Sequence, residues 1–332
     1  MIEKEIILDG ASMLNGLFAC DLVNNLKILQ DNFKAKIVAR DNWIRISSEN
    51  LSWVEEVRLF IEELVKIYES GHVIRQKDFE LSLSSAISKS KFKVKDLYSE
   101  AIKVSPKKNT IVPRTINQCH YIQEIKNRDV IFGIGPAGTG KTYLAMAMAI
   151  SYFLTDKCNR IVLTRPAMEA GENLGFLPGT LEEKIKPYLR PLYDALYEML
   201  DFDEANKLIE SNVIEVAPLA FMRGRTLNNS FIILDEAQNT TVEQMKMLLT
   251  RIGLESKCVV TGDPSQTDLP QNKESGLNHA YRILRNIPEV GFLEFSHKDV
   301  VRNKIVEKII IAYEKGKRRA HANGTKSKPV VK

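Results

Sequence analysis

The chain has 332 residues, of which 44% are hydrophobic and 27% are charged. This length allows two domains, and this composition is ordinary for a soluble globular protein, so collagen-like and disorder-dominated classes are excluded. The formal net charge is +5, but residues 315–332 contain seven Lys or Arg residues and no acid. Subtracting these seven charges leaves residues 1–314 with a net charge of −2. The basic character therefore predicts a disordered basic tail, which can add salt-sensitive affinity for phosphate backbones.

The cysteine pattern and hydropathy indicate a cytoplasmic protein. Four scattered cysteines and five histidines show neither the spacing of a zinc site nor a disulfide framework, which suits a reducing cytosol. The N-terminal sequence MIEKEIILDG contains acids and lacks a long apolar run. No later window approaches the roughly 18 apolar residues that a membrane span needs. We therefore expect no membrane association.

Residues 21–71 predict a small α+β domain. DLVNNLKILQDNF (21–33) has the leucine spacing of an amphipathic helix, and the short strands AKIVAR and NWIRIS flank a turn at Asp41 and Asn42. In the longer helix that follows, Ser52 and Glu55 predict an N-terminal capping box and Gly71 predicts the C-terminal cap. This order of elements is KH-like, but no GXXG loop for gripping RNA occurs between them. Nucleic-acid binding by this domain, and simple packing or oligomerisation, both stay open.

The polar, Lys-rich and Pro-containing stretch KVSPKKNTIVPRT (103–115) is the best candidate for a linker. It predicts an N-terminal domain over residues 1–102, a second domain over residues 116–314 and the tail over residues 315–332. Within the second domain, helical runs alternate with six apolar strand candidates: DVIFGI, RIVLT, NVIEVA, SFIILDE, KCVVTGD and GFLEF. Strands without polar alternation are buried on both faces. We therefore predict an α/β fold with a mostly parallel sheet covered by helices on both faces.

GPAGTGKT follows the first of these strands and precedes the helical run YLAMAMAISYF. The P-loop pattern consists of a glycine, four further residues and then Gly-Lys-Thr, placed between a strand and a helix, and this segment matches it. Backbone N–H groups of such a loop converge on phosphate oxygens, and the next helix adds the positive end of its dipole. The pattern predicts that ATP is bound by Gly135, Pro136, Ala137, Gly138, Thr139, Gly140, Lys141 and Thr142. Lys141 is expected against the β- and γ-phosphates, and Thr142 is expected to give its hydroxyl to Mg²⁺.

Polar residues follow two further strands at the edge of the sheet where ligands collect. Asp235 ends the strand FIIL and stands at the position that coordinates Mg²⁺ in P-loop proteins. The adjacent Glu236 is placed to accept a proton from the attacking water. Gln266, in GDPSQ after the strand CVVT, carries a donor and an acceptor on one amide, which suits it to orient a γ-phosphate and its water.

These motifs resemble those of the PhoH family of P-loop ATPases. Six motifs occur in the following order over roughly residues 110–315: GPAGTGKT, TRPAMEAGENLGFLPG, KPYLRPLYDAL, PLAFMRGRTLNNSFIILDEAQNTT, TGDPSQTDLP and DVVR. The family resembles the nucleotide-binding core of superfamily-one helicases. This resemblance implies that Gln118 reads adenine, that Thr164 and Arg165 touch the nucleic-acid backbone, and that Arg302 stabilises the transition state. Asn303 stands where the family usually has His, so no role of that histidine is carried over.

The resulting prediction is a Mg²⁺-dependent ATPase of the RecA-like P-loop NTPase fold, which acts on single-stranded RNA and is stimulated by it. Whether it also unwinds RNA, as helicases do, stays open. One alternative is an ATP-gated interaction protein with slow turnover, which recruits an RNA-processing partner such as an endoribonuclease or a ribosome-associated protein. A small-metabolite kinase is disfavoured, because DEAQ and GDPSQ indicate a water nucleophile.

The length of the second domain bears on assembly. Superfamily-one helicases use two such cores in one chain, whereas roughly 200 residues hold only one core. A homo-oligomer such as a hexameric ring is therefore expected, with Arg302 reaching the ATP of a neighbouring subunit. The alternative for Arg302 is an ordinary ion pair with Glu307 or another acid.

Overall fold

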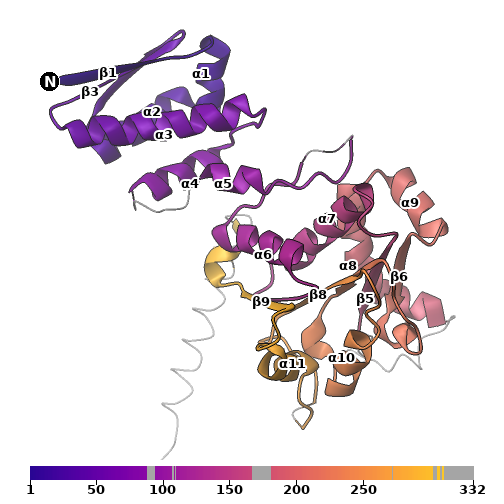
Figure 1. Ribbon diagram of the computed structural model, residues 1–332. Coiled ribbons are helices and arrows are strands. Elements are labelled where there is room, and N and C mark those ends of the chain that lie inside the picture. Colours follow the sequence, from indigo (N-terminus) through magenta and orange to yellow (C-terminus); the bar gives the residue numbers. More distant parts are fainter. Residues whose placement is uncertain are drawn as a thin grey trace, which may run out of the picture. The chain divides into compact units, whose positions relative to one another are not determined.

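The computed structural model describes residues 1–87, 94–106, 108, 110–166, 181–270, 272–301, 305, 306 and 309. The chain divides into two compact units, Met1–Gln123 and Glu124–Lys332 (Figure 1). Inside the first unit, Ile102 and Ile111 pair through two backbone hydrogen bonds of 2.8 Å, across part of the expected linker. Arg302, Glu307 and residues 315–332 lie outside the described residues, so what the sequence predicts for them stays a prediction.

The first unit is built on a three-stranded antiparallel sheet in the order β1-β3-β2. Its elements are β1 (Ile2–Ile7), α1 (Ala11–Leu17), α2 (Leu22–Phe33), β2 (Lys36–Arg40), β3 (Trp43–Ser48), α3 (Leu51–Glu69), α4 (Gln76–Ile87) and α5 (Val94–Ser99). The predicted helix, two strands and helix correspond to α2, β2, β3 and α3. The prediction omitted β1, which pairs with β3 along its whole length. Strand β1 depends on that long-range pairing, because its own sequence, IEKEII, has three consecutive charged residues and lacks the alternation of a strand.

The N-cap of the long helix α3 lies two residues earlier than its sequence predicted. Asn50 is the N-cap, and its side chain accepts a hydrogen bond of 2.9 Å from the Ser52 N–H. The predicted capping box is therefore wrong, since Asx-type capping by Asn50 replaces it and Glu55 instead pairs with Arg58. At the other end, Gly71 has φ +82° and follows the C-cap residue, which confirms the predicted glycine termination.

The core of the first unit lies between the sheet and its helices. Helix α3 contacts β1 and β3, and α1 and α2 contact β2. The sheet contributes the fully or nearly buried residues Ile37, Ile44 and Ile46, which alternate with outward-facing positions. One face of the three-stranded sheet therefore packs against the helices.

The second unit contains a six-stranded parallel sheet in the order β6-β5-β7-β8-β4-β9, which confirms the predicted α/β fold. All six predicted strands form: β4 (Val130–Ile134), β5 (Arg160–Arg165), β6 (Ile214–Pro218), β7 (Ser230–Leu234), β8 (Lys257–Gly262) and β9 (Val290–Glu294). The helices are α7 (Lys141–Leu154), α8 (Leu181–Met199), α9 (Phe202–Glu210), α10 (Val242–Leu249) and α11 (Gly276–Leu284). Helix α6 (Ile116–Asn127) crosses from the first unit into the second. The short 3-10 helices are η2 (Leu219–Met222), η3 (Ala237–Asn239) and η4 (His297–Asp299).

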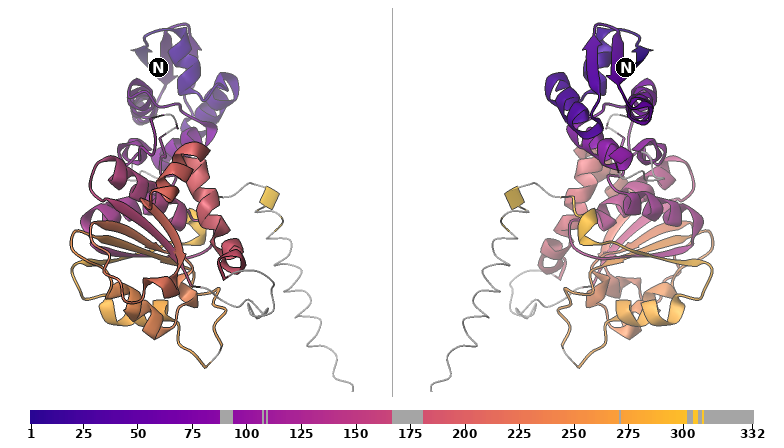
Figure 2. Two further views of the ribbon diagram at one scale, coloured as in Figure 1. Left: turned by 90° about the vertical axis from the view of Figure 1, so that its right-hand side faces the viewer. Right: turned by 90° about the vertical axis from the view of Figure 1, so that its left-hand side faces the viewer.

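Helices cover both faces of this sheet (Figure 2). On one face α7 contacts β5, β7 and β8, and the rings of Tyr152 and Phe231 lie 5.3 Å apart. On the other face α10 and α11 pack in a cluster that includes Ile232 and Val260. The central strands are consequently buried on both sides, which explains why their sequences lack polar alternation. Within the described part of the chain, no helix combines the length and the hydropathy needed to cross a bilayer.

Candidate active site

Four neighbouring strands deliver polar residues to the same edge of the six-stranded sheet. Strand β4 leads into the P-loop, β7 ends before Asp235 and Glu236, β8 ends before Asp263, and β5 ends with Arg165. The order β5-β7-β8-β4 places β8 between the P-loop strand and the strand that precedes the two acids. A threonine on β8 therefore lies between the P-loop helix and Asp235.

The P-loop has the backbone conformation that the glycine pattern predicts. Gly135, Gly138 and Gly140 have φ values of +144°, +82° and +83°, which side-chain-bearing residues rarely adopt. A Cβ at Gly135 would also lie 2.5 Å from the Phe295 carbonyl oxygen. Helix α7 starts at Lys141, directly after Gly140, with no side-chain cap. Its first N–H groups therefore form the kind of anion site that phosphates occupy.

The Lys141 side chain packs against the P-loop. Its side chain is largely buried, and Nζ donates hydrogen bonds to the carbonyl oxygens of Gly135 (2.6 Å) and Pro136 (2.8 Å). Burial lowers the pKa of the Lys141 ammonium, while the negative charges of Asp263, Asp235 and Glu236 act in the opposite direction. The site thus places a cation among three acids at the mouth of the P-loop.

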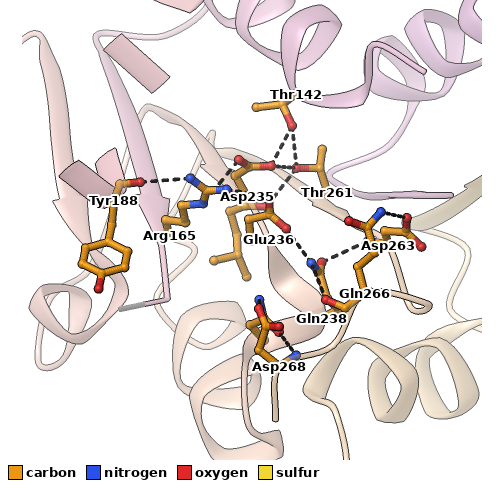
Figure 3. Close-up of polar contacts among 12 residues, drawn as sticks. Thr142, Arg165, Tyr188, Asp235, Glu236, Gln238, Thr261, Asp263, Gln266 and Asp268 are labelled. Atoms are coloured by element: carbon orange, nitrogen blue, oxygen red, sulfur yellow. Dashed lines mark hydrogen bonds and ion pairs between the residues drawn. The ribbon is translucent and has the colours of Figure 1, made fainter. Parts of the chain in front are cut away.

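Thr142 and Asp235, the two predicted magnesium ligands, lie in direct contact (Figure 3). The Thr142 hydroxyl donates to Asp235 Oδ1 at 2.6 Å, and the Thr261 hydroxyl, on β8, donates to the same oxygen at 2.8 Å. Hydroxyl and carboxylate oxygens suit Mg²⁺, which is held by one or two carboxylates together with phosphates and water. No cluster of three or more His, Cys, Asp or Glu side chains able to hold a metal occurs among the described residues, and this kind of site needs none. The donor set therefore fits a nucleotide-bound Mg²⁺.

Glu236 occupies an unusual backbone position with a well-defined side chain. Its φ of +54° lies in the left-handed region, which costs a non-glycine residue roughly 1–3 kcal/mol and is common at functional sites. One carboxylate oxygen accepts from Arg165 Nη2 and the other accepts from Gln238 Nε2. The side chain is 38% exposed, so it remains in reach of a water molecule at the sheet edge.

Arg165 holds both acids from the neighbouring strand β5. Besides Glu236, its guanidinium lies 3.7 Å from Asp235 Oδ2 through Nε and donates to the Tyr188 carbonyl oxygen of α8 at 2.9 Å through Nη1. Its side chain is only 18% exposed. Arg165 is therefore part of the carboxylate site.

Thr164, which the helicase resemblance places in contact with nucleic acid, lies in the interior of the second unit, and that contact stays a prediction. Its side chain is fully buried, and its hydroxyl has no hydrogen-bond partner among the described residues. Its backbone carbonyl instead accepts from the Asp235 N–H at 2.9 Å. Neither Thr164 nor Arg165 thus presents a free side chain to RNA in this structure.

Gln266 reaches the site through Asp263. Its side-chain amide donates to the Asp263 carboxylate, which also accepts from the N–H (3.0 Å) and hydroxyl (2.7 Å) of Ser265. Burial raises the pKa of Asp263, but the hydrogen bonds from Ser265 and Gln266 and the charge of Lys141 outweigh it and hold the pKa below its usual value. Asp263 is thus a fixed anion beside the P-loop.

Sequence reasoning missed two residues of this network. Thr261 bridges the two magnesium ligands, and the almost fully buried Gln238 joins the segment of Glu236 to that of Gln266. Gln238 donates to Glu236 and accepts from the Asp263 N–H at 3.0 Å (Figure 3). Both residues stand inside the quoted motifs, but only the strand order reveals their bridging positions.

The predicted adenine-reading residue, Gln118, lies on α6 within the first unit. Its side-chain oxygen accepts from the Arg114 N–H at 2.6 Å, and the residue is buried. Its role toward adenine stays a prediction.

Comparison with protein families identifies the family of the chain. A family model described as "PhoH: PhoH-like protein" matches residues 110–314, which include the P-loop, Arg165, the two acids and Gln266. The chain belongs to the PhoH-like family. This membership and the fold make it a P-loop ATPase by family and confirm the resemblance seen in the sequence.

Relatives of the PhoH-like chain extend the similarity into the first unit. It is 49% identical over 291 residues to a PhoH-like protein of Mycobacterium tuberculosis strain H37Rv, covering 87% of this chain and 82% of the relative. It is 44% identical over 290 residues to one of Bacillus subtilis strain 168, covering 87% and 91%. Protein PhoH of Escherichia coli K12 is 41% identical over 205 residues, covering 61% and 58%.

Among solved structures, the UvsW helicase from bacteriophage T4 shares 12% identity with a TM-score of 0.36, covering 62% of this chain and 69% of that one. The Pif1 helicase from Candida albicans shares 16% identity with a TM-score of 0.29, covering 55% and 39%.

Proposed function

We propose that this PhoH-like protein binds ATP with Mg²⁺ and hydrolyses it. The observation that carries the proposal is the contact between Thr142, at the start of the P-loop helix, and Asp235, beside Glu236. A P-loop alone would support only phosphate binding, whereas an adjacent carboxylate pair supplies both a metal ligand and an acceptor for the proton of water.

The residues divide the reaction among them. Backbone N–H groups of residues 135–142 and the Lys141 ammonium hold the phosphates, and Thr142 and Asp235 hold Mg²⁺, which would supply charge neutralisation. Glu236 accepts the proton of the attacking water, and Gln266 orients that water or the γ-phosphate. Arg165, at the end of β5, and Gln238 hold the Glu236 carboxylate in place by donating to its two oxygens. Gln238 is itself held by the N–H of Asp263, which directly follows β8. Arg302, from a neighbouring subunit, is the proposed source of further positive charge.

The second part of the proposal is a role in RNA metabolism. It is supported by the seven cations without an acid in residues 315–332 and by the resemblance of the motifs to superfamily-one helicases. A cytoplasmic homo-oligomer is also proposed, because the cysteines show no disulfide framework and because the second domain is long enough for only one core. The competing function is an ATP-gated interaction protein with slow turnover, and it differs in predicting one hydrolysis rate with and without RNA.

The test is ATP hydrolysis measured with single-stranded RNA, with DNA and with neither, in Mg²⁺ and again in excess EDTA, alongside the mass of the assembly. The proposal predicts hydrolysis that requires Mg²⁺ and rises with RNA. Hydrolysis that persists in Lys141→Ala would trace the activity to a contaminant, and a rate indifferent to RNA would favour the gated interaction protein.

A further inference from the structure

The sheet of the first unit has a second face that its helices do not cover. Helices α2 and α3 lie on one side of this sheet (Figure 1). The buried residues Ile37, Ile44 and Ile46 belong to the core between the sheet and the helices, so the alternate positions are on the opposite face. These outward positions are Glu3, Glu5 and Ile7 on β1, Trp43, Arg45 and Ser47 on β3, and Lys36, Val38 and Arg40 on β2. This set is called the outer face below.

An aromatic side chain lies on the central strand of the outer face. Trp43 is directly opposite Ile7 on one side and Arg40 on the other. It is half-buried, whereas Ile7 is 68% exposed. The Arg45 guanidinium carbon lies 5.0 Å from the centroid of the Trp43 ring, in cation–π geometry. Trp43 and Ile7 therefore place a partly exposed aromatic ring and an exposed aliphatic side chain next to each other on the outer face.

Charge on the outer face is divided between its two edge strands. Lys36 and Arg40 lie on β2, and neither side chain forms an ion pair or hydrogen bond with the described residues. The acids lie on the opposite edge, on β1, where Glu5 is neutralised by Arg45 at 2.9 Å. Glu3 is farthest from Trp43 along β1, paired across from Ser47. On the neighbouring strands, the residues directly opposite Trp43 are therefore the apolar Ile7 and the cationic Arg40.

We propose that the outer face binds single-stranded nucleic acid, with a base stacked on Trp43 and phosphates beside Lys36 and Arg40. Every base has a π-face, so an aromatic platform beside cations binds single strands with little sequence preference. Lys36 and Arg40 are four residues apart on one strand, about 13 Å, so the two cations can contact separate phosphates. This mode differs from that of KH modules, which grip RNA through a GXXG loop that this chain lacks between its strands. The proposal deepens the RNA part of the proposed function and is independent of ATP hydrolysis.

The chain offers a matched reporter, because it contains only two tryptophans, Trp43 and Trp53. Trp53 lies on α3, is also half-buried and also has a cation near its ring, Lys34 at 5.3 Å. In Trp53→Phe, Trp43 is the sole tryptophan, and its fluorescence should be quenched when single-stranded oligouridylate is added without nucleotide. In Trp43→Phe, Trp53 is the sole tryptophan, and its fluorescence should not change.

Affinity is measured separately by the anisotropy of a fluorescein-labelled oligouridylate of about 12 nucleotides. Trp43→Ala should weaken binding by about fivefold to a hundredfold, the usual effect of losing one stacked base. Trp43→Phe should retain most of the affinity, and Trp53→Ala should leave it unchanged. Arg40→Ala and Lys36→Ala should each make the salt dependence shallower by about 0.7 in log–log slope. A circular dichroism spectrum and an ATPase rate equal to those of the wild type would establish that each variant is folded.

Three results would overturn the proposal. Oligouridylate that binds without quenching Trp43, and equally well to Trp43→Ala, would place RNA elsewhere on the chain. No binding by the wild type would remove both the platform and the RNA role, while Mg²⁺-dependent hydrolysis would still stand. A Trp43→Ala protein of smaller assembly mass but unchanged RNA affinity would show that the outer face contacts a second copy of the chain.

Discussion

Replacing Arg165 with alanine should slow ATP hydrolysis while leaving ATP binding almost intact. The change removes the donor to one oxygen of Glu236, the cation 3.7 Å from Asp235 and the 2.9 Å link to α8. Glu236 would keep only Gln238 as a restraint. A reacting group displaced by about 1 Å can cost roughly a hundredfold in rate, so kcat should fall about tenfold to a hundredfold. The KM for ATP should change by less than about threefold, because the P-loop is untouched.

The cost in stability should be modest and can be separated from the catalytic effect. Charge-assisted hydrogen bonds contribute about 1.5–3 kcal/mol when buried, but Glu236 is 38% exposed, so solvent screening reduces the expected loss to about 1–2 kcal/mol. Arg225 provides the control, since it donates to both carboxylate oxygens of Glu215, at 2.5 and 2.7 Å, away from the site. Arg225→Ala should destabilise the protein similarly and leave kcat within about twofold.

Steady-state kinetics and denaturant unfolding of Arg165→Ala, Arg165→Lys and Arg225→Ala test this reasoning. Lysine keeps the charge but cannot reach three partners at once, so Arg165→Lys should remain slow. An Arg165→Ala enzyme with normal RNA-free kcat and weakened RNA binding would refute the positioning role and restore the backbone contact implied by the helicase resemblance.

Three further substitutions or titrations follow from the structure. Thr261→Val removes the hydroxyl between Thr142 and Asp235 and keeps the shape of the side chain. In a Mg²⁺ titration, this variant should need more Mg²⁺ for half-maximal hydrolysis and should have a kcat that is roughly tenfold lower. An unchanged titration would contradict the bridging role of Thr261. Gly276→Ala would bring a Cβ to 2.5 Å from the Thr241 carbonyl oxygen. Because overpacking costs about 1–3 kcal/mol, this variant should have a Tm several degrees lower than that of the wild type. An unchanged Tm would show that α11 can shift to make room for the methyl group. Burial raises the pKa of Cys258 to about 12, so above pH 9 the unfolded chain loses a thiol proton that the folded chain retains, and the free energy of unfolding should fall as pH rises from about 9. Cys258→Ala should show a smaller fall over this range in urea unfolding, and identical slopes would argue against a buried thiol.

The second unit was predictable because its signals are local and strong. Uninterrupted apolar strands, a P-loop between a strand and a helix, and acids directly after a strand each follow from neighbouring residues. Asp235 and Thr142 are 93 positions apart, yet both could be placed at one sheet edge because parallel strands share their carboxyl ends. The roles of Thr261 and Gln238 could not be predicted, since they depend on β8 lying between β4 and β7.

The first unit shows what local signals leave out. Strand β1 contains three consecutive charged residues, as a solvated segment does, and becomes a strand only through pairing with β3. The helix cap was placed two residues late because Asn50 and Ser52 are both good N-cap residues, and only the backbone conformation selects Asn50. Arg165 was expected on an RNA-facing surface because the helicase resemblance carries a motif but not the side-chain rotamer, which turns toward the two acids.

The most direct test of the account is a comparison of ATP binding and ATP hydrolysis in Glu236→Gln. The amide keeps the size of the side chain and its contact with Gln238 but cannot accept a proton from water. The account predicts that Mg²⁺ and ATP bind with an affinity close to that of the wild type, while turnover falls by at least a hundredfold. Undiminished turnover in Glu236→Gln would contradict the assignment of Glu236 as the base of this site.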